Sequence, residues 1–428
     1  MLINQNPVMP STQIPAAKRS GSKPRRISFI NFSLLSILVL FFSLANSASA
    51  SSCQPPAVPG VNQLLAQGAT LASNMQTDFG RLQHSSACYL EVWPVNTSQV
   101  AALVKTAYAN NVPIRTQGAS HSENGSSLPH QFELLIHTAR LNTITFEKTG
   151  TVTVGTGIPV ALVKDFVARH SSFFMPVSND GGVAPTVGGY ISAGGIGLTS
   201  DLYSGFWEHV NSITLVTGSG KIVHIKKHDP IFQYIFGSMG QLGIMTEAVL
   251  NLLPNESLPF NYPLGESYTI RYPTTNGYYW TKPNADQSIY WFNLFASPEE
   301  FSQAKSDLEN LENKYPQALK YRPIYIWKVI RASITPPLVY DKPSDFYAIG
   351  IWGNRAGDSE SMKQLQSLAM DFDALVFQKK YRRYIQTEIS ASPELYKRYY
   401  SRKTYTEFLK IKSSLDPKFL FNQRSFFK

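Results

Sequence analysis

The segment from residue 185 to residue 198 constrains this chain more than any other. It reads Pro-Thr-Val-Gly-Gly-Tyr-Ile-Ser-Ala-Gly-Gly-Ile-Gly-Leu, with five glycines in fourteen residues. Glycine lets the backbone adopt positive φ and approach a ligand with no Cβ in the way, although a plain loop would also fit this composition. Upstream, residues 117–125 form a second small-residue loop, Gln-Gly-Ala-Ser-His-Ser-Glu-Asn-Gly. Two such loops in this order indicate a flat, phosphate-bearing cofactor lying against main chain.

The first fifty residues have the composition of an export signal. Five basic residues and no acidic residue precede the apolar run 27–44, and the small-residue stretch 45–50 ends in Ala-Ser-Ala. This order is typical of a secretory signal, and we expect cleavage after Ala50. The alternative is an uncleaved anchor, since about eighteen apolar residues nearly span a bilayer. The sequence therefore predicts a secreted or periplasmic protein with no stable membrane span after cleavage, or else a membrane-anchored one.

Composition bounds the rest of the chain. The 428 residues are 43% hydrophobic, enough for one large or two medium domains. The formal net charge is +10, and loss of the five basic residues of the signal leaves +5. This mildly basic surface does not indicate a nucleic-acid partner. The two cysteines, Cys53 and Cys88, could form one disulfide in an exported protein or remain as two thiols.

Side-chain periodicity predicts a mixture of helices and strands after residue 90. We expect a helix capped by Thr97 and Ser98 and ended by Asn110 and Asn111. A second helix should open at Pro159 and continue to Arg169. Strands are expected at 112–115, 151–154 and 243–254, and as a hairpin at 212–217 and 221–225. Tyrosine and tryptophan become frequent after about residue 255, which predicts a domain boundary there, and the last forty residues look helical.

Several common active-site motifs are absent from the sequence. It has no Gly-x-x-x-x-Gly-Lys phosphate loop, no strand-led Gly-x-Gly-x-x-Gly with an acidic residue about twenty positions on, and no Gly-x-Ser-x-Gly elbow. The eight histidines lack metal-ligand spacing, so no metal site is expected. These absences argue against a nucleotide hydrolase, a doubly wound dinucleotide fold, a serine hydrolase and a metalloenzyme.

The glycine-rich loops instead resemble a known cofactor domain. Residues 118–122, 185–189 and 194–197 look like the FAD-binding domain of the vanillyl-alcohol-oxidase superfamily, also called the PCMH-type fold. Further similarity follows at 212–223, 232–234 and 237–246, and the last of these is especially similar to cytokinin dehydrogenases. Asp416-Pro417 and Asn422-Gln423 resemble the C-terminal strand of the family.

The resemblance implies an α+β fold with a two-subdomain FAD-binding domain and an α+β substrate domain, or cap. After the predicted signal peptide at 1–50, it divides the chain into a PCMH-type FAD-binding domain at 51–254, a cap at 255–400 and a C-terminal segment, 401–428, that returns to the FAD-binding domain. Five aromatic residues of the cap favour a flat substrate: Tyr278, Tyr279, Trp280, Tyr290 and Trp291. About half of these five are expected in the core instead.

The resemblance also implies which residues contact FAD. Main-chain N–H groups of the loop 117–122 can surround the pyrophosphate without lysines. Ile244 aligns with a backbone contact to the cofactor, and Gln423 with a glutamine near the isoalloxazine end. The other expected contacts come from the two small-residue loops: Gly118, Ala119, Ser120, His121, Ser122, Ser126, Thr186, Gly188, Gly189, Ser192 and Ile196.

His121 occupies the position at which many members of the superfamily bind the flavin covalently. A neutral imidazole is a competent nucleophile, so FAD attached through His121 is expected, and a loop histidine that only hydrogen-bonds FAD is the alternative. Relatives with a second, cysteinyl link carry that cysteine immediately before Pro-Thr-Val-Gly. Ala184 stands at that position in this sequence, so a doubly attached flavin is not expected.

Asp180 is the candidate catalytic base. A carboxylate near the flavin could accept the substrate proton as hydride leaves for flavin N5. Asp180 lies six residues before Thr186, one more than the cytokinin dehydrogenase pattern, and lacks its aromatic context. An exposed aspartate in a turn is the alternative.

The expected function is that of an exported FAD-dependent oxidoreductase, similar to cytokinin dehydrogenase. It would oxidise a C–N or C–O bond of a small-molecule substrate, with oxygen or another electron acceptor reoxidising the flavin. An alditol- or aldonolactone-type oxidase also fits the sequence of residues 117–125, which we call the histidine loop because it contains His121. A flavin-binding protein without turnover is the alternative from another functional class.

Overall fold

The computed structural model describes residues 53, 60–147, 150–179, 185–197, 199–257, 287–318, 324–356, 359–387 and 397–422. The chain divides into two compact units, Met1–Ser52 and Cys53–Lys428, and all described residues lie in the second. The predicted signal, with its apolar run, lies outside the described residues. Among the helices that are described, none combines the length and the apolar character needed to cross a bilayer.

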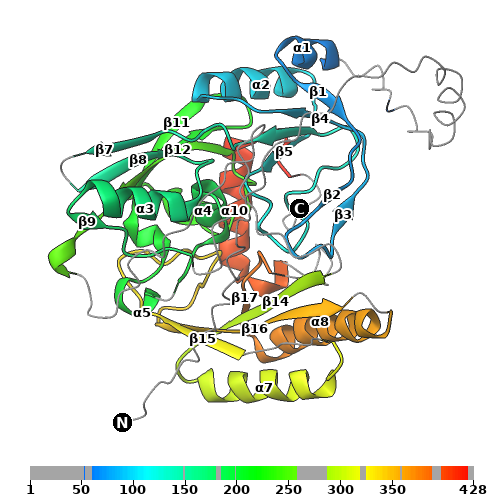
Figure 1. The fold of residues 1–428 in the computed structure, drawn as a ribbon, viewed down its shortest axis with the longest axis vertical. Helices are drawn as coiled ribbons and strands as arrows, with labels where there is room; N and C mark the ends of the chain where they lie inside the picture. Colours follow the sequence, from blue (N-terminus) through cyan, green and yellow to red (C-terminus); the bar gives the residue numbers. More distant parts are fainter. Residues whose placement is uncertain are drawn as a thin grey trace, which may run out of the picture. The chain divides into compact units, whose positions relative to one another are not determined.

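A small four-stranded sheet forms the N-terminal part of the second unit (Figure 1). Its strand order is β1-β4-β6-β5, with β4 and β5 both parallel to β6 and β1 antiparallel to β4. The strands span Thr70–Ala72 (β1), Tyr89–Val92 (β4), Leu134–His137 (β6) and Ile114–Gln117 (β5). The helices α1 (Val61–Ala66) and α2 (Thr97–Ala109) contact each other beside it.

Helix α2 confirms the predicted helix but corrects its cap. The side chain of Asn96, not that of Thr97 or Ser98, accepts the free Gln99 N–H at 2.9 Å, as an asparagine cap commonly does. The apolar positions of α2 recur with helical spacing and are buried in the same core cluster as Leu134 and Ile136 of β6: Val100, Leu103, Val104 and Ala107.

A short hairpin precedes β4. It consists of β2 (Gln76–Thr77) and β3 (His84–Ser85), which pair antiparallel. A disulfide between Cys53 and Cys88, with Cα atoms 5.7 Å apart, encloses the hairpin in a covalent loop. Of the two alternatives that the sequence leaves open for the cysteines, the structure has the disulfide.

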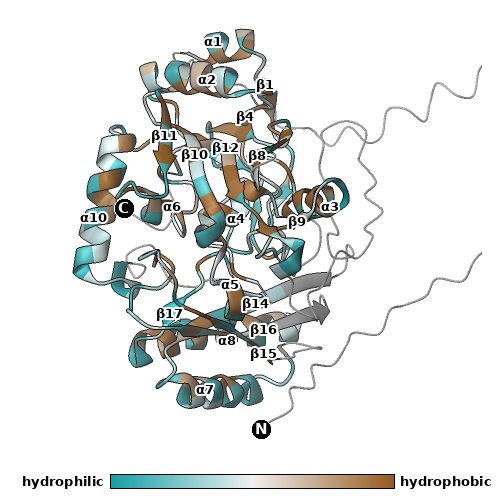
Figure 2. Cartoon of the chain, turned by 90° about the vertical axis from the view of Figure 1, so that its left-hand side faces the viewer, coloured by the Kyte–Doolittle hydropathy of each residue, from teal (hydrophilic) through white to brown (hydrophobic). Residues whose placement is uncertain are grey.

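The second sheet has five antiparallel strands in the order β11-β10-β12-β8-β7. They span Ile222–Lys226 (β11), Val210–Val216 (β10), Ile244–Asn251 (β12), Thr151–Gly155 (β8) and Ile144–Glu147 (β7). The predicted hairpin is therefore confirmed as β10 and β11. Figure 2 shows β12 largely in the hydrophobic colour, and Ile244, Ala248 and Leu250 are buried at alternate positions.

Short helices and a small strand pair complete this part of the unit. Helix α3 (Val160–His170) begins after Pro159, as predicted, and β9 (Phe173–Phe174) pairs with β13 (Leu253–Pro254). The remaining elements are α4 (Val187–Ala193), α5 (Ser200–Tyr203), η1 (Phe206–His209), α6 (Phe232–Ile235) and η2 (Asn255–Ser257).

A third sheet, which we call the cap sheet, lies after residue 286. Its order is β15-β16-β14-β17, with all neighbours antiparallel. The strands span Ile324–Val329 (β15), Phe346–Ala356 (β16), Gln287–Ala296 (β14) and Arg382–Arg383 (β17). The helices α7 (Phe301–Lys314) and α8 (Ser359–Lys379) pack on one face, where Phe301 contacts Tyr347 and Phe372 contacts Phe292 (Figure 1).

The opposite face of the cap sheet meets the part of the unit that carries the glycine-rich segment. The Ile330 N–H donates to the carbonyl of Ser200, at 3.1 Å. Trp291 and Phe295 lie on this face, and the centroid of each of their rings is 5.4 Å from that of the Tyr384 ring. The predicted boundary near residue 255 borders residues outside the described ranges and stays a prediction.

The last described segment returns to the first sheet. After the 3-10 helix η3 (Lys397–Tyr399), α10 spans Arg402–Leu415 and is capped by Ser401, whose side chain accepts the Thr404 N–H. Beyond it, Ile114 of β5 donates to Leu420 and accepts from Asn422, and Phe421 forms a parallel bridge with Ile114. The C-terminal segment thereby extends the first sheet at the edge strand β5.

Candidate functional site

A cavity opens where three loop regions between residues 116 and 245 converge. Its lining comes from residues 116–127, 185–193 and 239–245, with single residues from the segments that follow β6 (Thr138), β8 (Thr156) and β17 (Gln386). The empty space measures about 800 Å³, open solvent at the mouth included.

The two glycine-rich loops touch each other in this cavity. A Cβ on Gly118 would lie 2.5 Å from the Thr186 Oγ1, closer than atoms can approach. Thr186 caps α4, and its Oγ1 accepts the Gly189 N–H at 3.1 Å. Since the Gly118 Cα packs against this cap, only glycine fits at position 118.

The histidine loop leaves β5 through a strained residue. Ser120 has φ +48°, in the left-handed region that non-glycine residues rarely adopt. Such outliers gather at functional sites, where the surrounding structure holds them. Ser120 is 7% exposed, and the turn it makes puts both Ser120 and His121 in the lining.

A buried ion pair fixes the far end of this loop. The Arg115 guanidinium donates through Nε and Nη2 to the two Glu133 oxygens at 3.0 Å each, and its Nη1 donates to the Ser126 carbonyl at 2.8 Å. Both side chains are almost fully buried. A bidentate pair has one geometry, so it sets the position of Ser126 relative to β5.

The lining has the donors that a phosphate-bearing cofactor needs. Thr116 Oγ1 and Ser127 Oγ are buried, line the cavity, and have no hydrogen-bond partner within the described part of the chain. Buried hydroxyls are normally satisfied, so a bound ligand is their natural partner. Among the described residues, no lysine or arginine lines the cavity. Hydroxyls and main-chain N–H groups of the small-residue loops can therefore serve as donors without a basic side chain, which fits the expected binding of a pyrophosphate.

His121 lines the cavity with one face of its ring against Phe79. The ring centroids are 4.0 Å apart and the planes meet at 23°. The Phe79 N–H donates to the carbonyl of Ser122, next in the chain, at 3.2 Å. The orientation of the imidazole is thus set by a residue of the β2–β3 hairpin, far from the loop in sequence.

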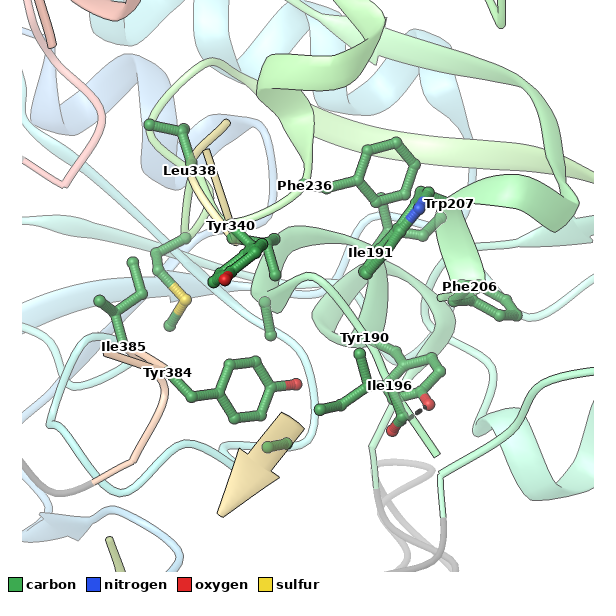
Figure 3. Close-up of a cluster of buried hydrophobic side chains, with 14 of the residues drawn as sticks. Tyr190, Ile191, Ile196, Phe206, Trp207, Phe236, Leu338, Tyr340, Tyr384 and Ile385 are labelled. Atoms are coloured by element: carbon green, nitrogen blue, oxygen red, sulfur yellow. Dashed lines mark hydrogen bonds between the residues drawn. The ribbon is translucent and has the colours of Figure 1, made fainter. Parts of the chain in front are cut away.

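Most of the sequence-predicted contacts lie in this one cavity: Gly118, Ala119, Ser120, His121, Ser122, Ser126, Thr186, Gly188, Gly189 and Ser192. Ile196 instead lies in the core, where its carbonyl accepts the Tyr190 hydroxyl at 2.7 Å (Figure 3). Ile244 is buried in β12 between Gly243 and Met245, which do line the cavity. Asp180, Ala184 and Gln423 lie outside the described residues.

The cap contributes to the rim of the site. Gln386 lines the cavity, and its carbonyl accepts the Glu123 N–H at 2.9 Å. The Asn124 amide donates to the carbonyl of Ile385. The segment after β17 is therefore docked on the histidine loop, and Figure 3 shows Tyr384 directed toward Ile196.

Aromatic side chains dominate the adjoining face of the cap sheet. The Tyr325 hydroxyl accepts hydrogen bonds from Trp291 Nε1 and Asn293 Nδ2. Burial raises the pKa values of Tyr325 and Tyr384 far above their ordinary value, so both phenols stay protonated and can donate. Of the predicted cap aromatics, Tyr290 and Trp291 are 0% and 8% exposed, whereas Tyr278, Tyr279 and Trp280 lie outside the described residues.

The sequence did not predict four residues of this site: Phe79, Arg115, Thr116 and Ser127. Thr116 lies one residue before the predicted loop 117–125 and Ser127 two residues after it, so a slightly longer loop would have included both. Phe79 and the Arg115–Glu133 pair carried no local signal, because their partners lie 42 and 18 positions away (121 − 79 and 133 − 115).

Comparison with known proteins adds independent support. A sequence profile of the family described as FAD binding domain matches residues 90–226. The chain is similar to D-lactate dehydrogenase of Archaeoglobus fulgidus, with 24% identity over 39% of each chain. It is also similar to D-2-hydroxyglutarate dehydrogenase of Xanthomonas citri pv. viticola, with 27% identity over 44% of this chain and 43% of the relative.

Cytokinin dehydrogenase 5 of Arabidopsis thaliana is 27% identical over 42% of this chain and 35% of that protein. The alignments thus span about two fifths of the length of these relatives. The predicted resemblance to PCMH-type FAD-binding proteins is confirmed, as is the mixed α+β fold.

Proposed function

We propose that this chain is an FAD-dependent oxidoreductase with FAD in the cavity described above, since a profile of FAD-binding domains matches residues 90–226. The observation that carries the proposal is the convergence of both small-residue loops on one cavity that holds two buried hydroxyls without a partner among the described residues. Substrate oxidation would transfer hydride from a carbon bound to nitrogen or oxygen.

The residues of the cavity would bind and orient the cofactor. Thr116, Ser127 and the main-chain N–H groups of the histidine loop would donate to its phosphates and hydroxyls. The Arg115–Glu133 pair would keep the loop in place without contacting the cofactor. Bound FAD would supply a two-electron acceptor, and Asp180 remains the proposed base for the substrate proton.

We further propose that His121 attaches the flavin covalently. The bond would replace one hydrogen of the flavin 8α-methyl group with an imidazole nitrogen. One 8α hydrogen and the imidazole N–H hydrogen would be released as two protons and two electrons, and molecular oxygen would accept all four to become hydrogen peroxide. The stacking of His121 in the lining supports this proposal, because it holds the ring at the cavity wall.

The substrate is proposed to be partly planar. Relatives are named for D-lactate and D-2-hydroxyglutarate, both carboxylates, and one for cytokinin. Trp291, Tyr325 and Tyr384 form an aromatic cluster with phenol donors on the face of the cap sheet that adjoins the rim of the cavity, and such a cluster favours a planar substrate.

We also propose that the protein is exported. The Cys53–Cys88 disulfide supports this, because such bonds persist mainly in oxidising compartments. N-terminal sequencing of the secreted protein should find a start near Ser51. A protein that keeps residues 1–50 and stays with the membrane fraction would favour the anchored alternative.

Anaerobic titration tests the function. The purified protein should be yellow, and a substrate from a panel of cytokinins, polyols, lactones, aromatic alcohols and 2-hydroxy acids should bleach its flavin absorbance. Bleaching by polyols or lactones would favour the alditol- or aldonolactone-type alternative. A yellow protein that no compound reduces would favour a flavin-binding protein, and a colourless one that takes up no FAD would refute the proposal.

The attachment is tested by replacing His121. We expect the parent protein to keep its flavin in the pellet after acid precipitation and His121→Ala to release it to the supernatant. His228→Ala, which changes an exposed histidine far along the chain, is the control and should retain flavin like the parent. Release of all flavin from the parent would make His121 a non-covalent neighbour.

A further inference from the structure

The tip of the β2–β3 hairpin lies against the histidine loop. The tip comprises residues 78–83, between Thr77 of β2 and His84 of β3. Besides the bond from Phe79 to Ser122, a Cβ on Gly125 would meet the Gln83 Cβ at 3.1 Å. The hairpin tip therefore contacts the loop near its middle and near its end.

The carboxyl group of Asp78 fixes the shape of this tip. Its Oδ1 accepts the N–H groups of Leu82 at 3.1 Å and Gln83 at 3.4 Å, and the Asp78 N–H donates to the Gln83 carbonyl at 3.2 Å. One buried side chain thus closes the turn, and the next residue, Phe79, ties the turn to the histidine loop through its bond to Ser122.

Phe79 projects from this braced turn onto His121. It is 3% exposed, and its ring covers the imidazole in a near-parallel stack. The side chain of a histidine on a loop could rotate about both of its torsion angles, χ1 and χ2. Contact with a ring that is itself held by main-chain and carboxylate bonds removes most of that freedom before any ligand arrives.

We propose that Phe79 is a positioning residue for flavin attachment, holding the His121 imidazole in the orientation from which its nitrogen reaches the flavin. The inference rests on the proposed covalent link. A reaction between held groups is faster because the entropy of orientation is lost beforehand. Phe79 precedes residues 90–226, so a segment outside the matched FAD-binding domain completes its site.

The variant Phe79→Leu tests the proposal, since it keeps apolar volume and removes the ring. Protein produced without flavin is mixed with FAD, and acid-stable flavin is followed over time at several FAD concentrations. We expect the rate constant at saturating FAD to fall at least about tenfold, with the non-covalent dissociation constant within about threefold of the parent value. Phe79→Tyr, which keeps the ring, should attach flavin faster than Phe79→Leu.

Leu82→Ala is the matched control, because Leu82 belongs to the same tip and packs against the main core. It should lower the melting temperature but leave the saturated rate near that of the parent. Phe79→Leu attaching flavin at the parent rate, or Leu82→Ala slowing attachment equally, would overturn the positioning role alone. A parent without any acid-stable flavin would instead refute the covalent link itself and the inference with it.

Discussion

At the scale of single residues, Asp78 has an unusual environment. Burial raises the pKa of its carboxyl group from the ordinary 3.8 to about 7, even though backbone N–H groups of the tip partly offset the shift. A raised pKa means that the folded protein binds the proton more tightly than the unfolded chain does. The stabilisation is thus fully present below about pH 4 and is lost as the pH rises through about 7.

Asp78→Asn should reveal this dependence. The amide keeps an acceptor oxygen for Leu82 and Gln83 but cannot ionise. The variant's free energy of unfolding minus that of the parent should therefore increase as the pH rises. The full shift corresponds to about 4 kcal/mol, of which about 3 kcal/mol develops between pH 5 and pH 8, because the unfolded carboxyl group is already mostly ionised at pH 5. Urea unfolding at these two pH values measures the gain. His137 and His209, whose pKa values burial lowers, are present in both proteins and cancel. Parallel pH profiles would contradict the assignment to Asp78.

At the scale of elements, the Cys53–Cys88 disulfide encloses the β2–β3 hairpin. The two cysteines are 35 positions apart, with the hairpin between them. The two paired residues on each strand give the hairpin little stability of its own. The disulfide therefore contributes to holding Phe79 against the histidine loop.

Replacing both cysteines with serine should lower stability and slow flavin attachment together. Closure of a loop this long corresponds to about 4 kcal/mol in the chain-entropy description. Thermal unfolding and the acid-stable flavin assay measure the two effects, and dithiothreitol treatment of the parent should reproduce both. A double variant that is destabilised but attaches flavin at the parent rate would show that the hairpin stays in place without the disulfide.

Elements whose signal is local were predictable from sequence, whereas contacts across the chain were not. Pro159 predicts the start of α3, and the alternating apolar residues of 151–154 predict β8, because each pattern lies in or next to the element that it specifies. The cap of α2 was misplaced by one residue because Asn96, Thr97 and Ser98 are all good capping residues, and only the geometry selects Asn96.

The site followed the same rule. The small-residue loops were found because their composition is unusual over several adjacent residues. The Phe79–His121 stack and the Arg115–Glu133 pair join ordinary residues that only the fold brings together. The two-residue strands β2 and β3 are too short to show any period, so nothing in the sequence announced the hairpin that carries Phe79.

At the scale of the whole second unit, the cavity depends on segments from far along the chain. The Lys412 ammonium of α10 is 2% exposed and donates to the carbonyls of Gln241 and Phe421 and to the Asp416 carboxylate. Gln241 belongs to the loop 239–245 that lines the cavity. Asp416 in turn accepts hydrogen bonds from the N–H groups of Leu420 and Phe421, the residues that pair with Ile114 of β5. One buried ion pair thus connects α10, the C-terminal segment and the cofactor cavity.

Lys412→Met should therefore damage stability and cofactor binding together. Burial lowers the pKa of Lys412 while the Asp416 charge opposes the shift, so removing the ammonium leaves a buried carboxylate without its cation. Breaking such a pair typically costs about 3–5 kcal/mol. Chemical unfolding measures this loss, and flavin content per protein should fall because the Gln241 carbonyl loses its donor. Lys410→Met, at an exposed position of the same helix, should change stability by less than about 0.5 kcal/mol. A Lys412→Met protein that is destabilised but binds FAD like the parent would show that the loop 239–245 holds its shape without α10.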